Sequence, residues 1–441
     1  MKQTGKMISI LLCICCLLSS AAFTGAAQND IHNVIFMIGD GMGYNHLKLA
    51  EEQGYEIFMD DAPDLQGWSR TRSANNRVTD SAAGATALAC GVRTNNHVLG
   101  LYPFGLKRIY AQPRSLTENA IYHGMKTGIV TSDSTAGATP AGFSVHTSDR
   151  GNTEDIIAQQ LSSRIDLIWG YNDQKATKDA VETAGFTHIA YQDELLALEP
   201  GSRSYGQFAH NVWKLDRSAN TPSLAEMTEK AISLLDTNND NGFFLMVEGA
   251  HIDKNSHASR DGQNDYPEKV ENVSIAAKGF DDAVRAAVDF AREDGHTIVL
   301  ITADHETGDL RFDESTGRLT FHSASHTGAN VPIFVYGAND LFENGATINN
   351  CSIANRLAEK LGWNERFPIK DALGTVAEPS EEPTADQPCF SIIEKVKDFF
   401  HTLIAWIKDV FKRLFNDTKI NEQLTAPWSL IAASSSSIPN K

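Results

Sequence analysis

Ser81 lies in a stretch, TDSAAGATALACG, whose residue types suit the activation of a serine hydroxyl. The alanines and other good helix formers that follow it predict that this serine lies in the first turn of a helix. Unpaired backbone N–H groups and the helix dipole favour negative charge there, on a serine alkoxide or on a bound phosphate oxygen. No Gly-x-Ser-x-Gly turn surrounds Ser81 to bring a histidine base, so metal ions are the other means of activating it. An Asp-Ser pair is also an ordinary helix N-cap, so other residues must decide between these interpretations.

Carboxylate and imidazole side chains follow several predicted strands and could supply the metal sites. Glu248, Asp253 and His257 fall within ten residues, and Asp304 and His305 are adjacent. Mixed carboxylate and imidazole ligands suit zinc, whereas ligands that are all oxygen suit magnesium. A solvated acidic rim explains poorly why histidines accompany the acids at several strand ends. The candidate ligands are Asp40, Thr139, Glu248, Asp253, His257, Asp304, His305 and His326.

Short apolar runs that alternate with helical patterns must position these residues. The predicted strands span 34–38, 127–131, 166–169, 243–247, 297–302 and 331–335, and the predicted helices span 115–123, 152–161, 223–235 and 270–293. Alternating β and α segments indicate an α/β fold, with a mostly parallel central sheet covered by helices on both faces. Ligands of such sheets gather at the carboxyl ends of the strands, where the candidate residues fall.

The composition and the net charge of the chain limit its possible locations and binding partners. Residues 1–27 combine two lysines, an apolar run and small residues, which predicts a cleaved signal peptide and an exported protein, periplasmic or extracellular. The net charge of −18 argues against nucleic-acid binding, because phosphate backbones need clustered Lys and Arg. Three of the six cysteines lie in the predicted signal, and Cys90, Cys351 and Cys389 form no disulfide framework.

The chain changes character after residue 375. We predict a catalytic domain over 28–375, an acidic proline-rich linker over 376–388, and a C-terminal helix and tail over 389–441. Residues 390–416 repeat apolar side chains at helical spacing and carry a net positive charge, which favours an interfacial helix on an anionic membrane. The apolar stripe could instead pack on the catalytic domain or form the seam of a homodimer.

Six motifs identify the chain as similar to the alkaline phosphatase family. IGDGMG, TDSAAGATA, GATP, VEGAHIDKNSHA, TADHETG and SHTGANVPIF match that family's motifs in order, over most of residues 30–365. The resemblance implies that small-molecule phosphate monoesters are hydrolysed at alkaline pH, through a phosphoserine intermediate on Ser81.

The resemblance also implies a role for each candidate residue. One Zn²⁺ would be held by Asp253, His257 and His326, a second Zn²⁺ by Asp40, Asp304, His305 and Ser81, and one Mg²⁺ by Asp40, Thr139 and Glu248. Arg150 lies 11 residues after Thr139, the family interval for the arginine that grips the phosphate. Lys254 is expected to contribute to substrate binding.

Gly137 departs from the family pattern, because relatives commonly have Asp or His two residues before the threonine. Loss of that side chain predicts a weakly occupied magnesium site, since groups around a metal's ligands tune its affinity. We also expect Lys254 to lack the acidic partner that an Asp at position 137 would provide, and so to lean towards the substrate phosphate.

Two rival functions are weaker. A sulfatase-like site would need an arginine four residues after the nucleophile, where this chain has Ala85, and diesterase relatives usually use threonine and lack the arginine matched by Arg150. A non-catalytic surface protein with a decayed phosphatase fold is the other alternative. The intact nucleophile, arginine and ligand positions argue against it.

Overall fold

The computed structural model describes residues 31–103, 110–171, 176–208, 220–363 and 369–370. The chain divides into two units, Met1–Ser380 and Glu381–Lys441, and the second lies wholly outside the described residues. The predicted signal peptide, acidic linker and C-terminal helix also lie outside them, as does Cys389. Among the described helices, none is long and apolar enough to cross a membrane.

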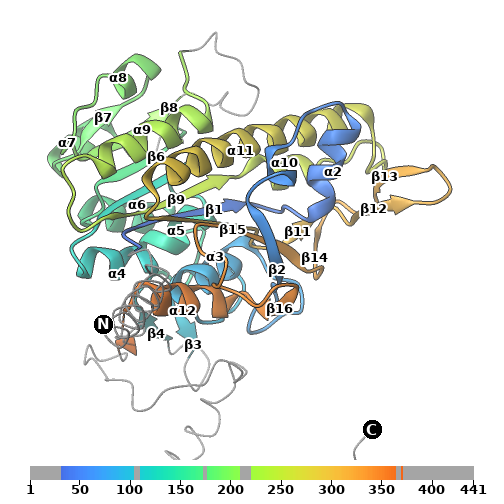
Figure 1. Cartoon of the computed structure of the whole chain (residues 1–441), viewed down its shortest axis with the longest axis horizontal. Helices are drawn as coiled ribbons and strands as arrows, with labels where there is room; N and C mark the ends of the chain where they lie inside the picture. The colour runs from blue at the N-terminus through green and yellow to red at the C-terminus, as the bar shows by residue number, and fades with distance from the viewer. Residues whose placement is uncertain (1–30, 104–109, 172–175, 209–219, 364–368, 371–441) are drawn as a thin grey trace, which may run out of the picture. The chain divides into compact units, whose positions relative to one another are not determined.

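A ten-stranded sheet runs through the centre of the first unit (Figure 1). Its strand order is β16, β2, β15, β10, β1, β9, β5, β6, β8, β7. The seven strands from β10 to β7 are all parallel to one another, whereas β15 is antiparallel to both β10 and β2. The predicted mostly parallel sheet is therefore confirmed. The ten strands are β1 (Asn33–Gly39), β2 (Asp64–Arg70), β5 (Lys126–Ser134), β6 (Leu167–Tyr171), β7 (Thr187–Ile189), β8 (Ser204–Phe208), β9 (Phe243–Gly249), β10 (Thr297–Thr302), β15 (Val331–Tyr336) and β16 (Ala346–Asn349).

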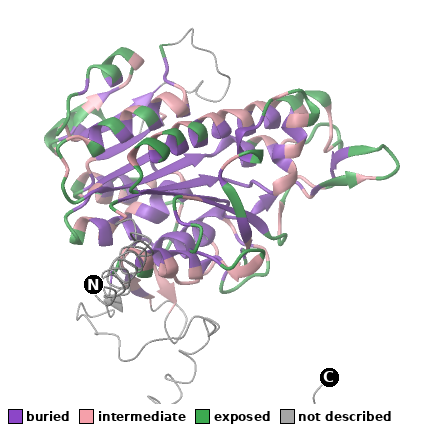
Figure 2. Ribbon diagram, viewed as in Figure 1, coloured by how far each residue is buried: buried purple, intermediate pink, exposed green. Residues whose placement is uncertain are grey.

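Helices cover both faces of this sheet, as predicted (Figure 1). Alternate residues of β1 enter different cores: Ile35 and Met37 pack with α2, α9 and α11, whereas Val34 and Phe36 pack with the helices of the other face. Figure 2 shows the strands buried along most of their length, which explains why their sequences are continuously apolar. The helices are α2 (Tyr44–Glu52), α3 (Ser81–Cys90), α4 (Leu116–Tyr122), α5 (Ala138–Ser144), α6 (Thr153–Ser162), α7 (Lys178–Thr183), α8 (Gln192–Leu196), α9 (Leu224–Asp236), α10 (His251–Ser256), α11 (Pro267–Asp294) and α12 (Cys351–Lys360), with a 3-10 turn, η1, at Phe58–Asp60.

Short strand pairs lie outside the main sheet. β11 (Glu306–Thr307) pairs with β14 (His326–Thr327), β12 (Leu310–Asp313) pairs with β13 (Arg318–Phe321), and β4 (Tyr110–Pro113) pairs with β3 (Tyr102–Pro103) and β17 (Ile369–Lys370). The first pair matters most for the site, because it joins the segment after β10 to the segment that carries His326.

The carboxyl ends of four adjacent strands are level with one another. The register aligns Thr302 of β10 with Ile38 of β1, Ile38 with Glu248 of β9, and Glu248 with Thr131 of β5. Residues that follow these strands therefore emerge at one edge of the sheet, as expected for a doubly covered parallel sheet.

Candidate active site

Ser81 is the first residue of α3, as the sequence predicts. Asp80 is the N-cap residue, and its Oδ1 accepts a hydrogen bond of 3.0 Å from the backbone N–H of Ala83. The helix ends at Gly91, which has φ of +65° and closes the last turn in the left-handed conformation. The buried Ser81 hydroxyl lies 3.2 Å from Nε2 of His305. The start of α3 thus places a serine beside a metal-capable imidazole.

Asp80 also holds Arg150 next to the serine. Its Oδ2 accepts a hydrogen bond of 3.1 Å from Nη1 of Arg150 and one of 3.0 Å from the backbone N–H of His97. The backbone N–H of Arg150 donates in turn to the carbonyl oxygen of His97, at 2.8 Å. The sequence indicated only a helix cap at Asp80, because its contact with Arg150 spans 70 residues of chain.

Asp253, His257 and His326 converge through their metal-binding atoms. Oδ1 of Asp253 lies 3.3 Å from Nε2 of His257 and 3.4 Å from Nε2 of His326, and the two Nε2 atoms are 2.9 Å apart. Each Nδ1 donates to a carbonyl oxygen, in His257 to Ala324 at 2.7 Å and in His326 to Thr79 at 3.0 Å. These outer hydrogen bonds orient both rings so that their Nε2 atoms face Asp253, as in histidines that bind a metal.

Asp40, Asp304 and His305 form a second convergent group. Nε2 of His305 lies 3.2 Å from Oδ2 of Asp304 and 3.5 Å from Oδ1 of Asp40. Both of these carboxylate oxygens are buried, and neither accepts a hydrogen bond from any residue that the structure describes. A buried, unpaired carboxylate oxygen is costly, and a cation removes that cost, so the donor set fits a metal ion.

The two groups meet at His305. Its ring stacks on that of His326 with centroids 3.6 Å apart, and the ligand atoms of Asp253, His305 and His326 lie within 4.8 Å of one another. Gly84 on α3 permits this packing, since a Cβ there would lie 2.9 Å from Cβ of Asp304. The small residues after Ser81 therefore let α3 approach the metal-capable side chains closely.

Glu248 and Thr139 are the remaining candidate ligands. Glu248 belongs to the buried end of β9 and accepts a short hydrogen bond from the hydroxyl of Thr131, its neighbour in the register. Thr139 is buried in the first turn of α5. These oxygen donors suit a hard cation such as magnesium.

The site is strongly acidic inside. Burial, reinforced by Asp304, Asp253 and Glu248, raises the pKa of Asp40 well above its ordinary value. Burial and the nearby Asp133 raise the pKa of Glu248 to about 8. Burial opposes ionisation of Asp253 as well, but hydrogen bonds from His257 and His326 outweigh it and hold the pKa of Asp253 well below its ordinary value. Bound cations would stabilise the ionised carboxylates.

These pKa shifts predict that the chelated protein loses stability as the pH rises. The pKa of Glu248 is raised in the folded state, so its stabilising contribution is complete below its ordinary pKa of 4.5 and is lost by about pH 8. The shift is equivalent to at most about 5 kcal/mol. Thermal melts in EDTA between about pH 5 and 8 should show a falling Tm, with a shallower fall in Glu248→Gln. A Tm of the chelated parent that rises over this range would contradict the prediction.

Lys254 is not placed as the sequence predicts. Its ammonium donates a short hydrogen bond to Oδ1 of Asp133, so the expectation that it lacks an acidic partner is wrong. This partner lies four residues before Gly137, whereas the family pattern indicates an acid only at position 137 itself. Thr307 was also missed: its hydroxyl donates to Asp253 and contacts Nδ1 of His305 at 3.2 Å, which joins the two metal-capable groups.

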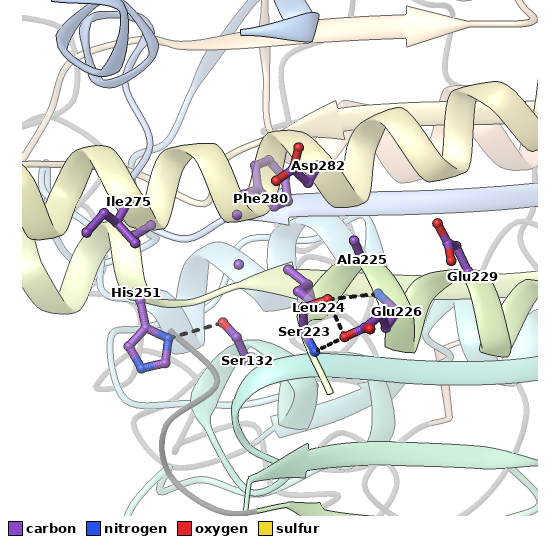
Figure 3. Close-up of a pocket in the computed structure, with 13 residues that line it drawn as sticks. Ser132, Ser223, Leu224, Ala225, Glu226, Glu229, His251, Ile275, Phe280 and Asp282 are labelled. Atoms are coloured by element: carbon purple, nitrogen blue, oxygen red, sulfur yellow. Dashed lines mark hydrogen bonds between the residues drawn. The ribbon is translucent and has the colours of Figure 1, made fainter. Parts of the chain in front are cut away.

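A cavity of about 400 Å³ lies between α9, α11 and the end of β9 (Figure 3). None of the candidate metal ligands is among its lining residues. At its edge, Oγ of Ser132 accepts a hydrogen bond of 2.9 Å from the backbone N–H of Ala250 and lies 3.2 Å from Nδ1 of His251. These contacts tie β5 to the start of α10, which carries Asp253 and Lys254.

Comparisons with known proteins agree with this geometry. A family model described as alkaline phosphatase matches residues 31–171 and 170–323. "Alkaline phosphatase 4" of Bacillus subtilis is 34% identical over 303 residues, which cover 63% of this chain and 62% of that protein. "Alkaline phosphatase" of Escherichia fergusonii is 30% identical over 408 residues, which cover 71% of this chain and 83% of that protein. The chain thus spans less than two thirds of the Bacillus relative.

A solved structure shows the same architecture. Alkaline phosphatase from the Antarctic bacterium TAB5 is 27% identical, with a TM-score of 0.62 and coverage of 76% of this chain and 99% of that one. A variant of the TAB5 enzyme matches equally well and has Mg bound in its M3 site. The family model extends from the strand that precedes Asp40 past the segment that carries Asp304 and His305. Because the family model matches more than half of the 441 residues, the chain belongs to the alkaline phosphatase family.

Proposed function

We propose that the chain is a metal-dependent phosphomonoesterase, which hydrolyses small-molecule phosphate monoesters to an alcohol and inorganic phosphate. The observation that carries this proposal is the position of Ser81, 3.2 Å from His305 and at the start of a helix whose cap also holds Arg150. Family membership supports the same activity. The chain spans only 62% of the Bacillus relative, so we put the activity forward as a proposal and not as an established property.

The proposed reaction has two displacements at phosphorus. In the first, the Ser81 hydroxyl loses its proton to solvent and its oxygen bonds to phosphorus, while the ester P–O bond breaks and the departing alkoxide takes a proton from solvent to leave as the alcohol. In the second, water attacks phosphorus and the Ser81 P–O bond breaks, which releases phosphate and restores the hydroxyl. The free N–H groups at the start of α3 favour the negative charge that develops on Ser81 and on the phosphate oxygens.

Two Zn²⁺ ions and one Mg²⁺ ion fit the donor sets. The mixed carboxylate and imidazole groups suit zinc, the first with Asp253, His257 and His326 and the second with Asp40, Asp304, His305 and Ser81. The oxygen donors of Asp40, Thr139 and Glu248 suit magnesium, and the Mg in the TAB5 variant supports a third site. Bound zinc would supply Lewis-acid chemistry that favours the serine alkoxide and neutralises the leaving oxygen.

Arg150 favours a monoester over a diester. Its side chain is about one third exposed, and one guanidinium nitrogen is fixed by Asp80, which leaves further N–H donors of the planar group for phosphate oxygens. A monoester has three non-bridging oxygens to offer to such donors, whereas a diester has two. The arginine therefore gives a physical reason for the substrate class.

This reasoning predicts that Arg150→Ala lowers kcat/KM for a chromogenic phosphomonoester roughly 10- to 100-fold, because charge-assisted hydrogen bonds to the phosphate are lost. The loss for the corresponding diester should be smaller. Arg150→Lys is the matched control, since it keeps the charge without the planar fork and should fall between.

Parallel assays of the parent with monoester, diester and sulfate ester, with and without chelator, test the proposed function itself. Chelator-sensitive turnover of the monoester is expected to dominate. Equal losses of kcat/KM for the monoester and the diester in Arg150→Ala would show that the arginine does not determine the substrate class. A parent that prefers the sulfate ester would contradict the proposed function.

The remaining predictions concern location and assembly. Export to the periplasm or the cell exterior follows from residues 1–27, and membrane-surface binding follows from residues 390–416. Packing on the catalytic domain and assembly as a homodimer are the alternative uses of the C-terminal apolar stripe. Each of these rests on residues outside the described part of the chain, and each stays a prediction.

A further inference from the structure

Asp133 is a partly buried acid that joins two sides of the candidate site. It lies near the end of β5, with 16% of its side chain exposed. Its carboxylate accepts a hydrogen bond of 2.7 Å from the backbone N–H of Ser134 and a short one from the ammonium of Lys254. Its own backbone N–H donates to Oγ1 of Thr131 at 2.8 Å, and that hydroxyl donates to Glu248. Asp133 is therefore one residue removed from a candidate metal ligand on one side and bonded to a cation on the other.

Gly137 provides the space for this carboxylate. A Cβ at position 137 would lie 2.9 Å from Oδ2 of Asp133 and 2.9 Å from the carbonyl oxygen of Ser134, closer than real Cβ atoms approach other heavy atoms. The φ of Gly137 is −55°, which any residue adopts, so its backbone does not require glycine. A side chain at 137 and the carboxylate of Asp133 thus compete for one volume.

The carboxylate holds Lys254 in a defined place. Lys254 lies on α10, directly after Asp253, and its Nζ donates to Oη of Tyr171 at 3.3 Å as well as to Asp133. Burial opposes ionisation of Asp133, but the Lys254 ammonium outweighs it, so the pKa of Asp133 lies below its ordinary value. The Lys254 side chain is still 39% exposed, and so it remains accessible to a ligand beside the metal-capable groups.

We infer that Asp133 is a positioning residue that fixes the Lys254 ammonium for contact with the phosphoryl group of the substrate, and that its carboxylate occupies space that a side chain at 137 would take. The inference rests on the proposed phosphatase function. The phosphoryl dianion is the ligand class that matches an exposed ammonium in a site that already contains Arg150. Tyr171 shares the task, since its hydroxyl restricts the same ammonium from a second direction.

A double-mutant cycle tests the inference. Asp133→Asn keeps the shape but removes the charge, and Lys254→Met removes the ammonium but keeps a long side chain. The dissociation constant of inorganic phosphate, measured by calorimetry on metal-loaded protein, should rise roughly tenfold in either single variant. The double variant should be no weaker than Lys254→Met alone, because Asp133 acts through that lysine. Additive losses would overturn the inference, and so would unchanged phosphate affinity accompanied only by a lower Tm.

Moving the carboxylate provides a second, independent measurement. Gly137→Asp alone should crowd Asp133 and lower the Tm, whereas Asp133→Gly combined with Gly137→Asp returns one carboxylate to the same volume. Partial recovery of phosphate affinity relative to Asp133→Gly is expected, because a Cβ at 137 also approaches the carbonyl oxygen of Ser134 at 2.9 Å. No recovery in a folded double variant would contradict the shared-volume argument.

The inference and the proposed function can fail separately. If the parent binds phosphate but hydrolyses no monoester, the proposed function is contradicted. The coupling between Asp133 and Lys254 can then still be measured through phosphate binding. If the parent hydrolyses monoesters but the losses of phosphate affinity in the double-mutant cycle are additive, only the inference is contradicted. A parent that neither binds phosphate nor hydrolyses monoesters overturns both.

Discussion

Ser81→Ala is expected to lose at least roughly 10³-fold in kcat on phosphate monoesters, because the oxygen that would bond to phosphorus is removed. The hydroxyl of Ser81 is the only group at the start of α3 that both contacts His305 and could act as a nucleophile among the described residues. Residual turnover would come from water attacking a substrate that Arg150 and the remaining site still bind.

The fold should survive this substitution. The cap of α3 is provided by Asp80, which bonds Ala83, and not by the Ser81 side chain, so removal of the hydroxyl leaves the helix start intact. Alanine is also the best helix former. We therefore expect a change in the free energy of unfolding within about 1 kcal/mol.

The measurement is acid quenching of the enzyme with labelled substrate, followed by detection of protein-bound phosphate. The parent should retain label on Ser81, and the alanine variant should retain none. Ser162→Ala is a matched control, because it deletes a hydroxyl that donates only to the carbonyl oxygen of Ala158 on the distant helix α6. Label of parental amount in Ser81→Ala would assign the nucleophile to another residue.

The sequence predicts the interior of this fold better than its edges. Every predicted strand is present, and 297–302 has the observed bounds of β10, because strands buried on both faces are continuously apolar. The prediction did not include β8, which reads SYGQF, or β7, which has three residues. β2 and β16 were missed as well. They lie at one edge of the sheet, where β2 reads DLQGWSR and β16 is only half-buried, so neither has an apolar run.

The candidate ligands were predictable because each comes directly after, or ends, a buried strand, or lies in a motif of the family. For Lys254, the sequence predicted no acidic partner, whereas the structure shows that it bonds Asp133. Its partner, Asp133, is 121 residues away in the sequence. Only the three-dimensional structure shows that the Asp133 carboxylate occupies space that a side chain at position 137 would also need. A single sequence does not show which residues, distant along the chain, occupy neighbouring space in the fold.

His305→Ala is expected to abolish activity and to lower zinc content more than removal of any other candidate histidine. The ring is fully buried, contacts the Ser81 hydroxyl, and contributes to both convergent groups of ligand atoms. Loss of outer-shell groups typically weakens metal binding 10- to 100-fold, so loss of a direct donor should weaken zinc binding by more than about 100-fold. The buried carboxylates of Asp40 and Asp304 would then face each other with neither metal nor imidazole between them.

His257→Ala is the matched comparison for this prediction, and His322→Ala is the control for histidine deletion as such. The His257 side chain is 40% exposed and contacts only the first group, so water can replace it and excess zinc should restore much of its activity. His322 bonds Thr320 and no candidate ligand, so its variant should retain parental zinc and turnover. Zinc content by mass spectrometry and activity across a zinc titration distinguish the cases. Rescue of His305→Ala by zinc at the concentration that rescues His257→Ala would show that the two histidines contribute alike, and that the buried position of His305 between the two groups gives it no special role.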